Sequence, residues 1–243
     1  MSRPWIGIAF AAVVAVVLGA KYFLRPNPHQ EAQFAREVAT RGLGGAIAAQ
    51  HPGKRVLVLS NPFTRRPGTD KRIVDMEEAG LRGLRSALEG KLAVGAVVHP
   101  ELRPEARENP RAVPIDTETT TPLSYLVAKD AFDRAAQEHP DWEVIVSLIG
   151  LPIELDKCES WRKEGAPSFA LLLPDLRMVG GAAAVAAAVK SGKLTAMVLR
   201  KPGGVGDDVP PGKDYRAEFD QRFILVTREN VDLWLGSHAG DFS

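Results

Sequence analysis

Short apolar runs alternate with helical segments along most of the chain. Six runs of six or seven residues are rich in Val, Leu, Ile and Ala: residues 55–60, 92–98, 143–149, 168–173, 194–199 and 222–227. A run that is apolar at consecutive positions indicates a strand that is buried on both faces. We therefore expect each run to form a strand of one sheet.

The segments between these runs have helical periodicity. In residues 70–89, apolar side chains recur at spacings of three and four, which places them on one face of a helix. Further helices are expected at residues 31–50, 121–138, 153–163 and 181–191. Glycines at positions 42, 44 and 45 weaken the helix at 31–50 and leave open a break into two. Four prolines predict a long irregular loop over residues 99–121.

Strands of this kind, separated by helices, predict a parallel sheet that is covered on both sides. Right-handed crossovers then give a doubly wound, Rossmann- or flavodoxin-like layering. We expect an α/β domain over residues 54–243, with a mainly parallel sheet of five to six strands and helices on both faces. Residues 26–53 are expected to form a linker and an amphipathic helix.

The opening segment has a different pattern. Residues 5–20 carry no charge, and residues 22–24 extend the apolar run past Lys21 to 20 positions. A helix of that length spans about 30 Å, the thickness of a hydrocarbon core. We interpret residues 5–24 as an uncleaved transmembrane helix, so that residues 1–25 anchor a single-pass membrane protein whose body is extracytoplasmic. A cleaved signal peptide and a buried N-terminal helix are the alternatives.

The rest of the chain is close to electrically neutral. The sequence has 31 basic and 30 acidic residues, and residues 1–25 contain three of the basic ones and none of the acidic ones. The body therefore has 28 bases against 30 acids, a net charge of −2. Sequence-independent nucleic-acid binding requires an excess of Lys and Arg, so we expect no nucleic-acid partner.

Motifs for cofactors or catalysis are absent from the sequence. The first strand run is followed by Asn61-Pro62-Phe63-Thr64 rather than by a glycine-rich phosphate loop, and no Gly-x-Ser-x-Gly elbow occurs. No grouping of His, Cys, Asp and Glu has metal-ligand spacing, and Cys158 is interpreted as a structural or surface thiol. The pairs Glu77-Glu78 and Arg65-Arg66 are interpreted as solvated. We expect no cofactor and no metal, and favour a protein that is not an enzyme.

Doubly wound sheets bind ligands beyond the carboxyl ends of the strands, where the strand order reverses. The candidate ligand-binding residues are therefore those that follow the first five runs: Ser60, Asn61, His99, Gly150, Asp175 and Lys201. The placement is geometric and does not depend on a motif. In an enzyme, His99 as a general base would act with Asn61 and Asp175 as dispersed strand-end residues.

The order of strands and helices resembles one lobe of a type I periplasmic-binding protein, together with Val146-Ser147-Leu148-Ile149-Gly150-Leu151-Pro152 after the third helix. The resemblance covers about residues 54–200 and is one of topology. The chain departs from that family because a two-lobed binding protein needs a second lobe, roughly another domain of length. The resemblance implies extracytoplasmic recognition at most, since a fold does not establish a function.

The leading hypothesis is a membrane-tethered, non-enzymatic α/β domain that binds a small ligand or a partner protein outside the cytoplasm. The enzyme with dispersed residues is one alternative. Another is a structural subunit of a membrane complex that docks through residues 31–50. A hollow at the carboxyl edge with convergent polar groups would favour binding or catalysis, whereas a closed edge and an exposed apolar patch elsewhere would favour assembly.

Overall fold

The computed structural model describes residues 27–163, 167–207, 209–210, 212 and 214–238. Within this part of the chain the strands are β1 (Arg55–Leu59), β2 (Ala93–Val98), β3 (Val144–Ser147), β4 (Ser168–Leu172), β5 (Leu194–Arg200) and β6 (Phe223–Thr227). Each strand lies within one of the six apolar runs or extends one residue beyond it. The predicted strands are therefore confirmed, and they form one sheet in the order β2-β1-β3-β4-β5-β6.

The sheet is parallel except at one edge. Strands β1 to β5 pair in parallel, and β6 pairs antiparallel with β5. The sheet grows from β1 toward β2 on one side and from β3 toward β5 on the other, so the strand order switches between β1 and β3. This is the doubly wound arrangement that the pattern predicts. Strand β6 runs backward because helix α9 (Tyr215–Arg222) leads directly into it, beside the carboxyl end of β5.

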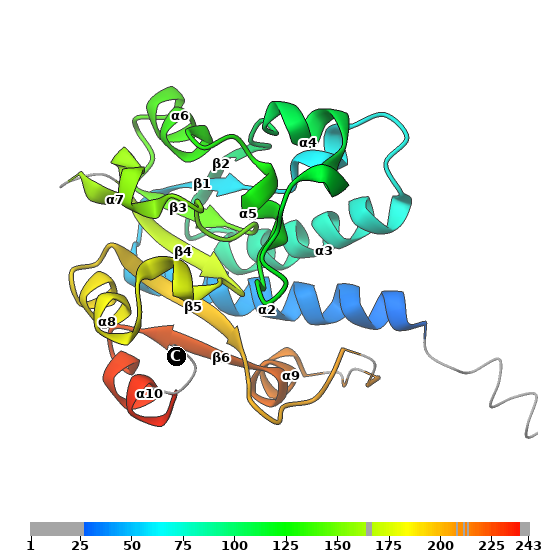
Figure 1. The fold of residues 1–243 in the computed structure, drawn as a ribbon. Coiled ribbons are helices and arrows are strands. Elements are labelled where there is room, and N and C mark those ends of the chain that lie inside the picture. Colours follow the sequence, from blue (N-terminus) through cyan, green and yellow to red (C-terminus); the bar gives the residue numbers. More distant parts are fainter. Residues whose placement is uncertain (1–26, 164–166, 208, 211, 213, 239–243) are drawn as a thin grey trace, which may run out of the picture.

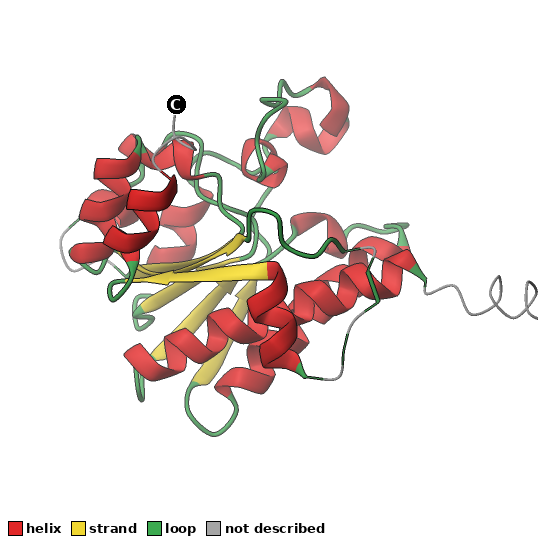
Figure 2. Ribbon diagram, turned by 90° about the horizontal axis from the view of Figure 1, so that it is seen from below, coloured by secondary structure: helices red, strands yellow, loops and turns green. Residues whose placement is uncertain are grey.

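Helices cover both faces of the sheet, as Figure 2 shows. One face carries α9 and two long helices, α2 (Pro28–Gln50) and α3 (Lys71–Leu88). The other face carries α5 (Pro122–Leu126), α6 (Ala131–Glu138), α7 (Glu159–Arg162), α8 (Ala182–Lys190) and α10 (Val231–His238). The short helix α4 (Pro104–Glu108) lies near the first turns of α3, at the edge of the sheet toward which β1 points (Figure 1).

Alternate side chains of the strands enter two separate cores. Leu57, Ile145 and Phe169 belong to the core under α6 and α8. Val56 and Val144 belong to the core under α2 and α3. Successive side chains of a strand point to opposite faces of a sheet, so a strand that is covered on both sides must be apolar at every position. This requirement explains the uninterrupted apolar runs.

Helix α2 is continuous, and its glycines serve packing. A Cβ atom at Gly44 would lie 2.9 Å from the Cβ of Ala87 on α3. On the opposing helix, a Cβ at Gly83 would lie 2.1 Å from the carbonyl oxygen of Glu37. These glycines therefore let the two helices approach closely, and the tertiary contact outweighs the low helix propensity of glycine.

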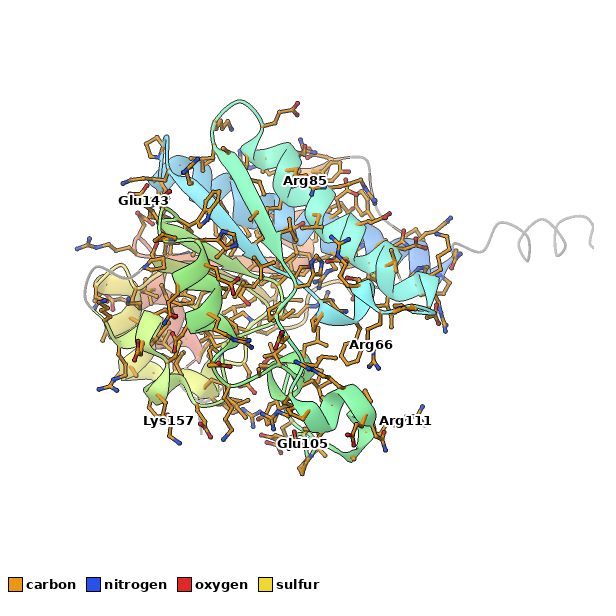
Figure 3. All side chains as sticks on the ribbon, turned by 90° about the horizontal axis from the view of Figure 1, so that it is seen from above. Arg66, Arg85, Glu105, Arg111, Glu143 and Lys157 are labelled. Carbon is orange, nitrogen blue, oxygen red and sulfur yellow. The ribbon has the colours of Figure 1, made fainter. Side chains whose placement is uncertain are left out.

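Several helix boundaries differ from the prediction. The helix expected at 121–138 is interrupted between α5 and α6, where Val127 forms a β-bridge with Leu102. The expected loop at 99–121 contains α4 and the 3-10 helix η2 (Pro110–Ala112), whose side of the molecule Figure 3 shows with Arg66, Glu105 and Arg111. These short helices exist because Leu102, Ala106 and Val113 bury one another in a small core of their own.

The remaining short elements are 3-10 helices: η1 (Pro62–Arg65), η3 (Leu155–Lys157) and η4 (Leu176–Val179). The helix expected at 153–163 is therefore split into η3 and α7. The apolar pattern does not predict α9 and α10. Both are only eight residues long, too short for a periodic stripe to stand out.

None of the helices in the described residues is both long enough and apolar enough to cross a bilayer. The transmembrane helix predicted at residues 5–24 lies outside the described residues. The described part begins at Asn27, the N-cap of α2, whose side-chain oxygen accepts a hydrogen bond from the backbone N–H of His29.

Candidate functional site

A hollow of about 570 Å³ lies at the carboxyl ends of β1, β3 and β4. We call it the switch hollow, because it lies where the strand order reverses. It is lined by His29, Arg36, Asn61, Asp70, Arg72, Ile73, Met76, Glu77, residues 120–123, Leu148, Ile149, Leu172 and Leu173. Its walls are thus the starts of α2 and α3 and the segment that enters α5, on the side toward which the arrows of the parallel strands β1, β3 and β4 point in Figure 1. This is the edge that the sequence predicts for a ligand.

Glu77 on α3 contributes a buried carboxylate to the hollow. It is hydrogen-bonded to His99 Nε2 at 2.6 Å, and Arg65 Nε donates to Nδ1 of the same ring at 3.3 Å. A guanidinium only donates and a carboxylate only accepts, so this arrangement requires a neutral ring with its proton on Nε2. Burial acts to raise the pKa of Glu77, but hydrogen bonding, chiefly from His99, holds it at about 2. Glu77 is therefore ionised at neutral pH.

The interpretation of Glu77 and Glu78 as a solvated pair is wrong for the first of them. Glu77 is 8% exposed, whereas Glu78 is exposed to solvent. Neighbouring positions of a helix point about 100° apart, so one can face the sheet edge while the other faces water. Arg65, expected to be solvated, is exposed but also hydrogen-bonded to His99.

Arg36 reaches the hollow from α2. Its Nη2 donates a long hydrogen bond of 3.4 Å to the carbonyl oxygen of Leu148, at the end of β3. Its Nε is buried and has no hydrogen-bond partner in the described part of the chain. Burial lowers the pKa of Arg36, and the Glu77 carboxylate opposes this effect. An arginine begins so far above neutrality that the guanidinium stays charged.

Arg36 lacks an ion-pair partner among the described residues, unlike the other charged or titratable side chains of the hollow. Each of those has a partner within ion-pair distance: His29 with Asp75 at 3.6 Å, Asp70 with Arg72 at 2.6 Å, and Glu77 with His99 at 2.6 Å. No described carboxylate lies within 4.0 Å of the Arg36 nitrogens. Arg36 is therefore a half-buried cation at the hollow whose charge is not neutralised by direct contact with a described carboxylate.

Three of the predicted site residues lie at or directly behind the switch hollow. Asn61 lines it, and its Oδ1 accepts a hydrogen bond from the backbone N–H of Phe63 at 2.9 Å. Ser60 is buried behind the hollow near Glu77, and its hydroxyl makes no hydrogen bond of good geometry to a described residue. His99 also lies behind the hollow, in contact with Glu77.

The other three predicted residues do not line the switch hollow. Gly150 packs behind its wall: its φ is +89°, and a Cβ there would lie 2.5 Å from the Cβ of Thr121, which lines the hollow. Asp175 lines a second hollow at the same edge. Lys201 lies in a groove between α2 and α9, where its Nζ donates to the carbonyl oxygen of Asp220 at 2.7 Å. The six residues therefore do not form a single cavity.

The second hollow, of about 500 Å³, adjoins the first and is called the side hollow here. Thr120 and Leu173 line both, so they form the ridge between them. Leu173 has a φ of +48°, a conformation that is uncommon for a non-glycine residue and found often at functional sites.

The Asp175 carboxylate of the side hollow is already satisfied. Arg177 donates from Nε and Nη2 to Asp175 at 3.0 and 2.7 Å, and it also pairs with Asp116 and Glu118 at 3.2 and 3.1 Å. Burial acts to raise the pKa of Asp175, but hydrogen bonding, chiefly from Arg177, lowers it below its usual range. The side hollow thus holds a closed ion network.

Sequence reasoning missed Arg36 and Glu77 as candidates. Both lie within helices, whereas the predicted site residues are those that follow strands. One signal was present for Glu77, which falls in the apolar stripe of its helix between Ile73 and Gly80, at spacings of four and three. A charged residue inside such a stripe indicates a buried polar contact. No comparable signal marks Arg36.

The arrangement offers recognition groups more readily than catalytic ones. Both ring nitrogens of His99 are engaged, and Asp175 lies across the ridge from Asn61, so the enzyme candidates do not converge. Burial raises the pKa of the Cys158 thiol to about 11, which keeps it protonated. Within the described residues, no three His, Cys, Asp or Glu side chains are grouped to hold a metal ion.

No family model matches the chain, and no curated protein matches it in sequence. Several solved structures are similar in fold. One is AraP, an arabinose-binding protein from Geobacillus stearothermophilus, with 14% identity and a TM-score of 0.43 over 82% of this chain and 62% of that one. Another is the substrate-binding protein of a sugar ABC transport system from Bordetella parapertussis 12822, with 11% identity and a TM-score of 0.46 over 81% and 57%.

A third is an ABC transporter solute-binding protein from Mycobacterium smegmatis with bound glycerol, at 12% identity and a TM-score of 0.44 over 84% and 61%. The chain thus spans 57 to 62% of the length of these three proteins. The predicted resemblance to type I periplasmic-binding proteins is confirmed as a resemblance of fold, at low sequence identity.

Proposed function

We propose that this chain is a membrane-tethered, non-enzymatic domain that binds a small molecule in the switch hollow, outside the cytoplasm. The position and volume of that hollow are the main support for the proposal. It lies at the switch point of the sheet, and its volume of about 570 Å³ falls within the range of small-molecule sites, roughly 300 to 1,000 Å³.

The lining of the hollow suits a ligand of mixed character. Leu148, Ile149 and Leu172 provide an apolar floor at the ends of the strands. Arg36 and Asn61 can donate hydrogen bonds from two sides, because the Asn61 oxygen is already occupied and its amide nitrogen is the end that can face a ligand. An apolar surface with a few convergent polar groups is typical of ligand sites.

The membrane tether belongs to the same proposal. His29, on the rim of the hollow, follows the predicted transmembrane segment by five residues. Five residues of extended chain reach at most about 18 Å. The hollow would therefore open close to the membrane surface, on the side that holds the body of the protein.

The structural-subunit alternative is less well supported. Helix α2, through which such a subunit would dock, buries Val38, Leu43 and Ile47 in the core against the sheet. The large apolar residues that are exposed in the described part of the chain, Ile73, Val209 and Leu233, come from three separate segments. An extended apolar docking face would instead require neighbouring exposed residues.

Thermal unfolding of the full-length chain in detergent micelles, across a panel of metabolites, tests the proposal. A ligand at 100 times its Kd stabilises the folded state by about 2.7 kcal/mol, a shift of several degrees in Tm. Ile73→Trp, which narrows the hollow from an exposed position, should abolish the shift.

Leu233→Trp, at a more exposed position on α10, is the matched control and should leave the ligand-induced shift unchanged. A panel without any shift would contradict the proposal. So would a shift that persists in Ile73→Trp, because the ligand would then bind elsewhere.

A further inference from the structure

The Arg36 side chain is half-buried, and its guanidinium lacks the contacts that normally stabilise such a group. Its Nε has no hydrogen-bond partner among the described residues, and Nη2 makes one long bond to a backbone carbonyl. A buried charge is costly unless it is paired and hydrogen-bonded. The folded chain alone therefore leaves Arg36 with unused donors at a cavity wall.

Arg222 shows how the same fold treats a structural buried arginine. It is 2% exposed, and its Nε donates to Glu218 at 2.9 Å. Its two other nitrogens donate to the carbonyl oxygens of Gly206 and Val209. Every branch of that guanidinium is satisfied. Arg103 also has buried nitrogens without hydrogen bonds, but it lines neither hollow. Arg36 combines unused donors with a position on the switch hollow.

The Glu77 carboxylate near Arg36 favours a ligand with a single negative charge. The ionised Glu77 carboxylate also lines the hollow, beyond ion-pair distance from Arg36 but near enough to interact electrostatically. A dianion such as a phosphate monoester would be repelled by Glu77 more strongly than a monoanion. A carboxylate has one charge, and its two oxygens match the planar fork of a guanidinium.

The remaining wall of the hollow is apolar and partly exposed. Ile73 is 38% exposed although it is a large apolar residue, and Met76 lines the hollow one turn further along α3. A ligand that covers these side chains gains from their removal from water. The bound molecule should therefore carry an apolar body in addition to its charged group.

We propose that the switch hollow binds a small monocarboxylate with an apolar body, whose carboxylate is held by Arg36 and whose body lies against Ile73 and Met76. The proposal rests on the binding function proposed above and specifies the chemical class of the ligand. Arg36 is its specificity-determining residue, because its guanidinium meets the charged end of the ligand.

The experiment is a calorimetric titration of the full-length chain in detergent with paired probes. The probes are acetate, isovalerate, hexanoate and phenylacetate, each compared with its uncharged amide, together with phenyl phosphate as a dianion. We expect at least one of the larger acids to bind about tenfold or more tightly than its amide, because a hydrogen bond to a charged group is stronger than one to a neutral group. Acetate, without an apolar body, should bind more weakly, and so should phenyl phosphate.

Variants then assign the effect to Arg36. Arg36→Gln should weaken binding of the acid about tenfold or more and leave binding of the amide unchanged. Arg36→Lys, which retains the charge without the fork, should give an intermediate affinity. Arg41→Gln, at an exposed position of the same helix, is the matched control and should change neither.

A stability measurement separates a ligand-binding role from a structural one. Arg36→Met removes a half-buried, incompletely satisfied charge, so the ligand-free variant should unfold at the same temperature as the parent or higher. A marked loss of stability in Arg36→Met would assign Arg36 to the fold and overturn the inference.

Equal affinity for the acids and their amides, or unchanged acid binding in Arg36→Gln, would also overturn it. If the metabolite panel still gave a shift that Ile73→Trp abolished, the proposed binding function would survive that failure. If no probe and no metabolite bound, both the proposed binding function and the proposed ligand class would be contradicted.

Discussion

The switch hollow and the side hollow share an edge of the sheet and a common ridge, but their charges are arranged differently. In the side hollow, Arg177 contacts Asp175, Asp116 and Glu118. In the switch hollow, Arg36 has no carboxylate within ion-pair distance among the described residues. The first arrangement is complete without a ligand, whereas the second leaves donors unused.

This difference shows why position at a sheet edge is not enough to identify a binding site. Both hollows lie beyond the carboxyl ends of strands and have similar volumes, about 570 and 500 Å³. A charged group that the protein has already neutralised offers a ligand little, because the ligand must displace existing partners. A charged group with unused donors offers a net gain. The comparison therefore favours the switch hollow as the binding site.

The largest expected effect concerns the wall of the switch hollow. Gly150→Ala combines an unfavourable φ of +89° with a Cβ that would meet Thr121 at 2.5 Å. Gly180→Ala, near the side hollow, has a φ of +100° but its Cβ would meet only Ala184, at 3.8 Å. We expect the first to lower the free energy of unfolding by about 3 kcal/mol and the second by about 1 to 2 kcal/mol.

Urea unfolding of both variants measures this difference. It separates the destabilisation caused by the steric clash of the Cβ from that caused by the positive φ. Gly150→Ala should also weaken ligand binding, because Thr121 must move. Equal losses of stability in the two variants would show that Gly150 is required for its backbone conformation alone.

The second prediction concerns the ion network of the side hollow. Arg177→Gln leaves the buried Asp175 carboxylate without the two hydrogen bonds from the Arg177 guanidinium. We expect it to lower the free energy of unfolding at pH 7 by about 2 kcal/mol, in contrast to the neutral or stabilising Arg36→Met. Chemical unfolding at pH 7 compares the two. Similar losses in both variants would contradict the distinction between a satisfied and an unsatisfied guanidinium.

The smallest effect is the pH dependence that Glu77 contributes. Its pKa is about 2 in the folded chain against 4.5 for the ordinary group, so the folded state holds fewer protons than the unfolded state between these values. The stability that ionised Glu77 adds to the folded state is therefore present above pH 4.5 and is lost as the pH falls toward 2. We expect the parent chain to lose about 1 to 2 kcal/mol more than Glu77→Gln over this range, after allowance for solvent screening.

Unfolding of both chains at a series of pH values from 6 to 2 measures that difference, and other carboxylates cancel in the comparison. Parallel stability curves for the parent and Glu77→Gln would show that the contact between Glu77 and His99 does not stabilise the folded chain.

The strands and the edge of the sheet could be predicted because their signals are local. Runs such as residues 55–60 are apolar at consecutive positions, which follows directly from burial on both faces. Asn61 and His99 lie at the carboxyl edge of the sheet, as predicted, because they follow strands. The interruption between α5 and α6 was not predictable, since it depends on Val127 pairing with Leu102, 25 residues earlier in the chain.

The chemistry of the hollow could not be predicted in the same way. Arg36 precedes the first strand, Glu77 lies within α3, and the carbonyl of Leu148 follows β3. No sequence pattern joins these three positions, because side chains from separate elements meet only when the helices pack on the sheet. Gly150 illustrates the same limit, because its close approach to Thr121 depends on tertiary packing and has no signal in the sequence.

The amino-acid sequence by itself determined the α/β class, the six strands of the described residues and the edge at which to search. It did so because hydrophobic periodicity is set by the local geometry of each strand and helix. Only the tertiary structure decided which charges meet there, since that depends on contacts between residues far apart in the chain. It paired Glu77 with His99 and Arg177 with Asp175, and it left Arg36 with unused donors at the wall of a cavity.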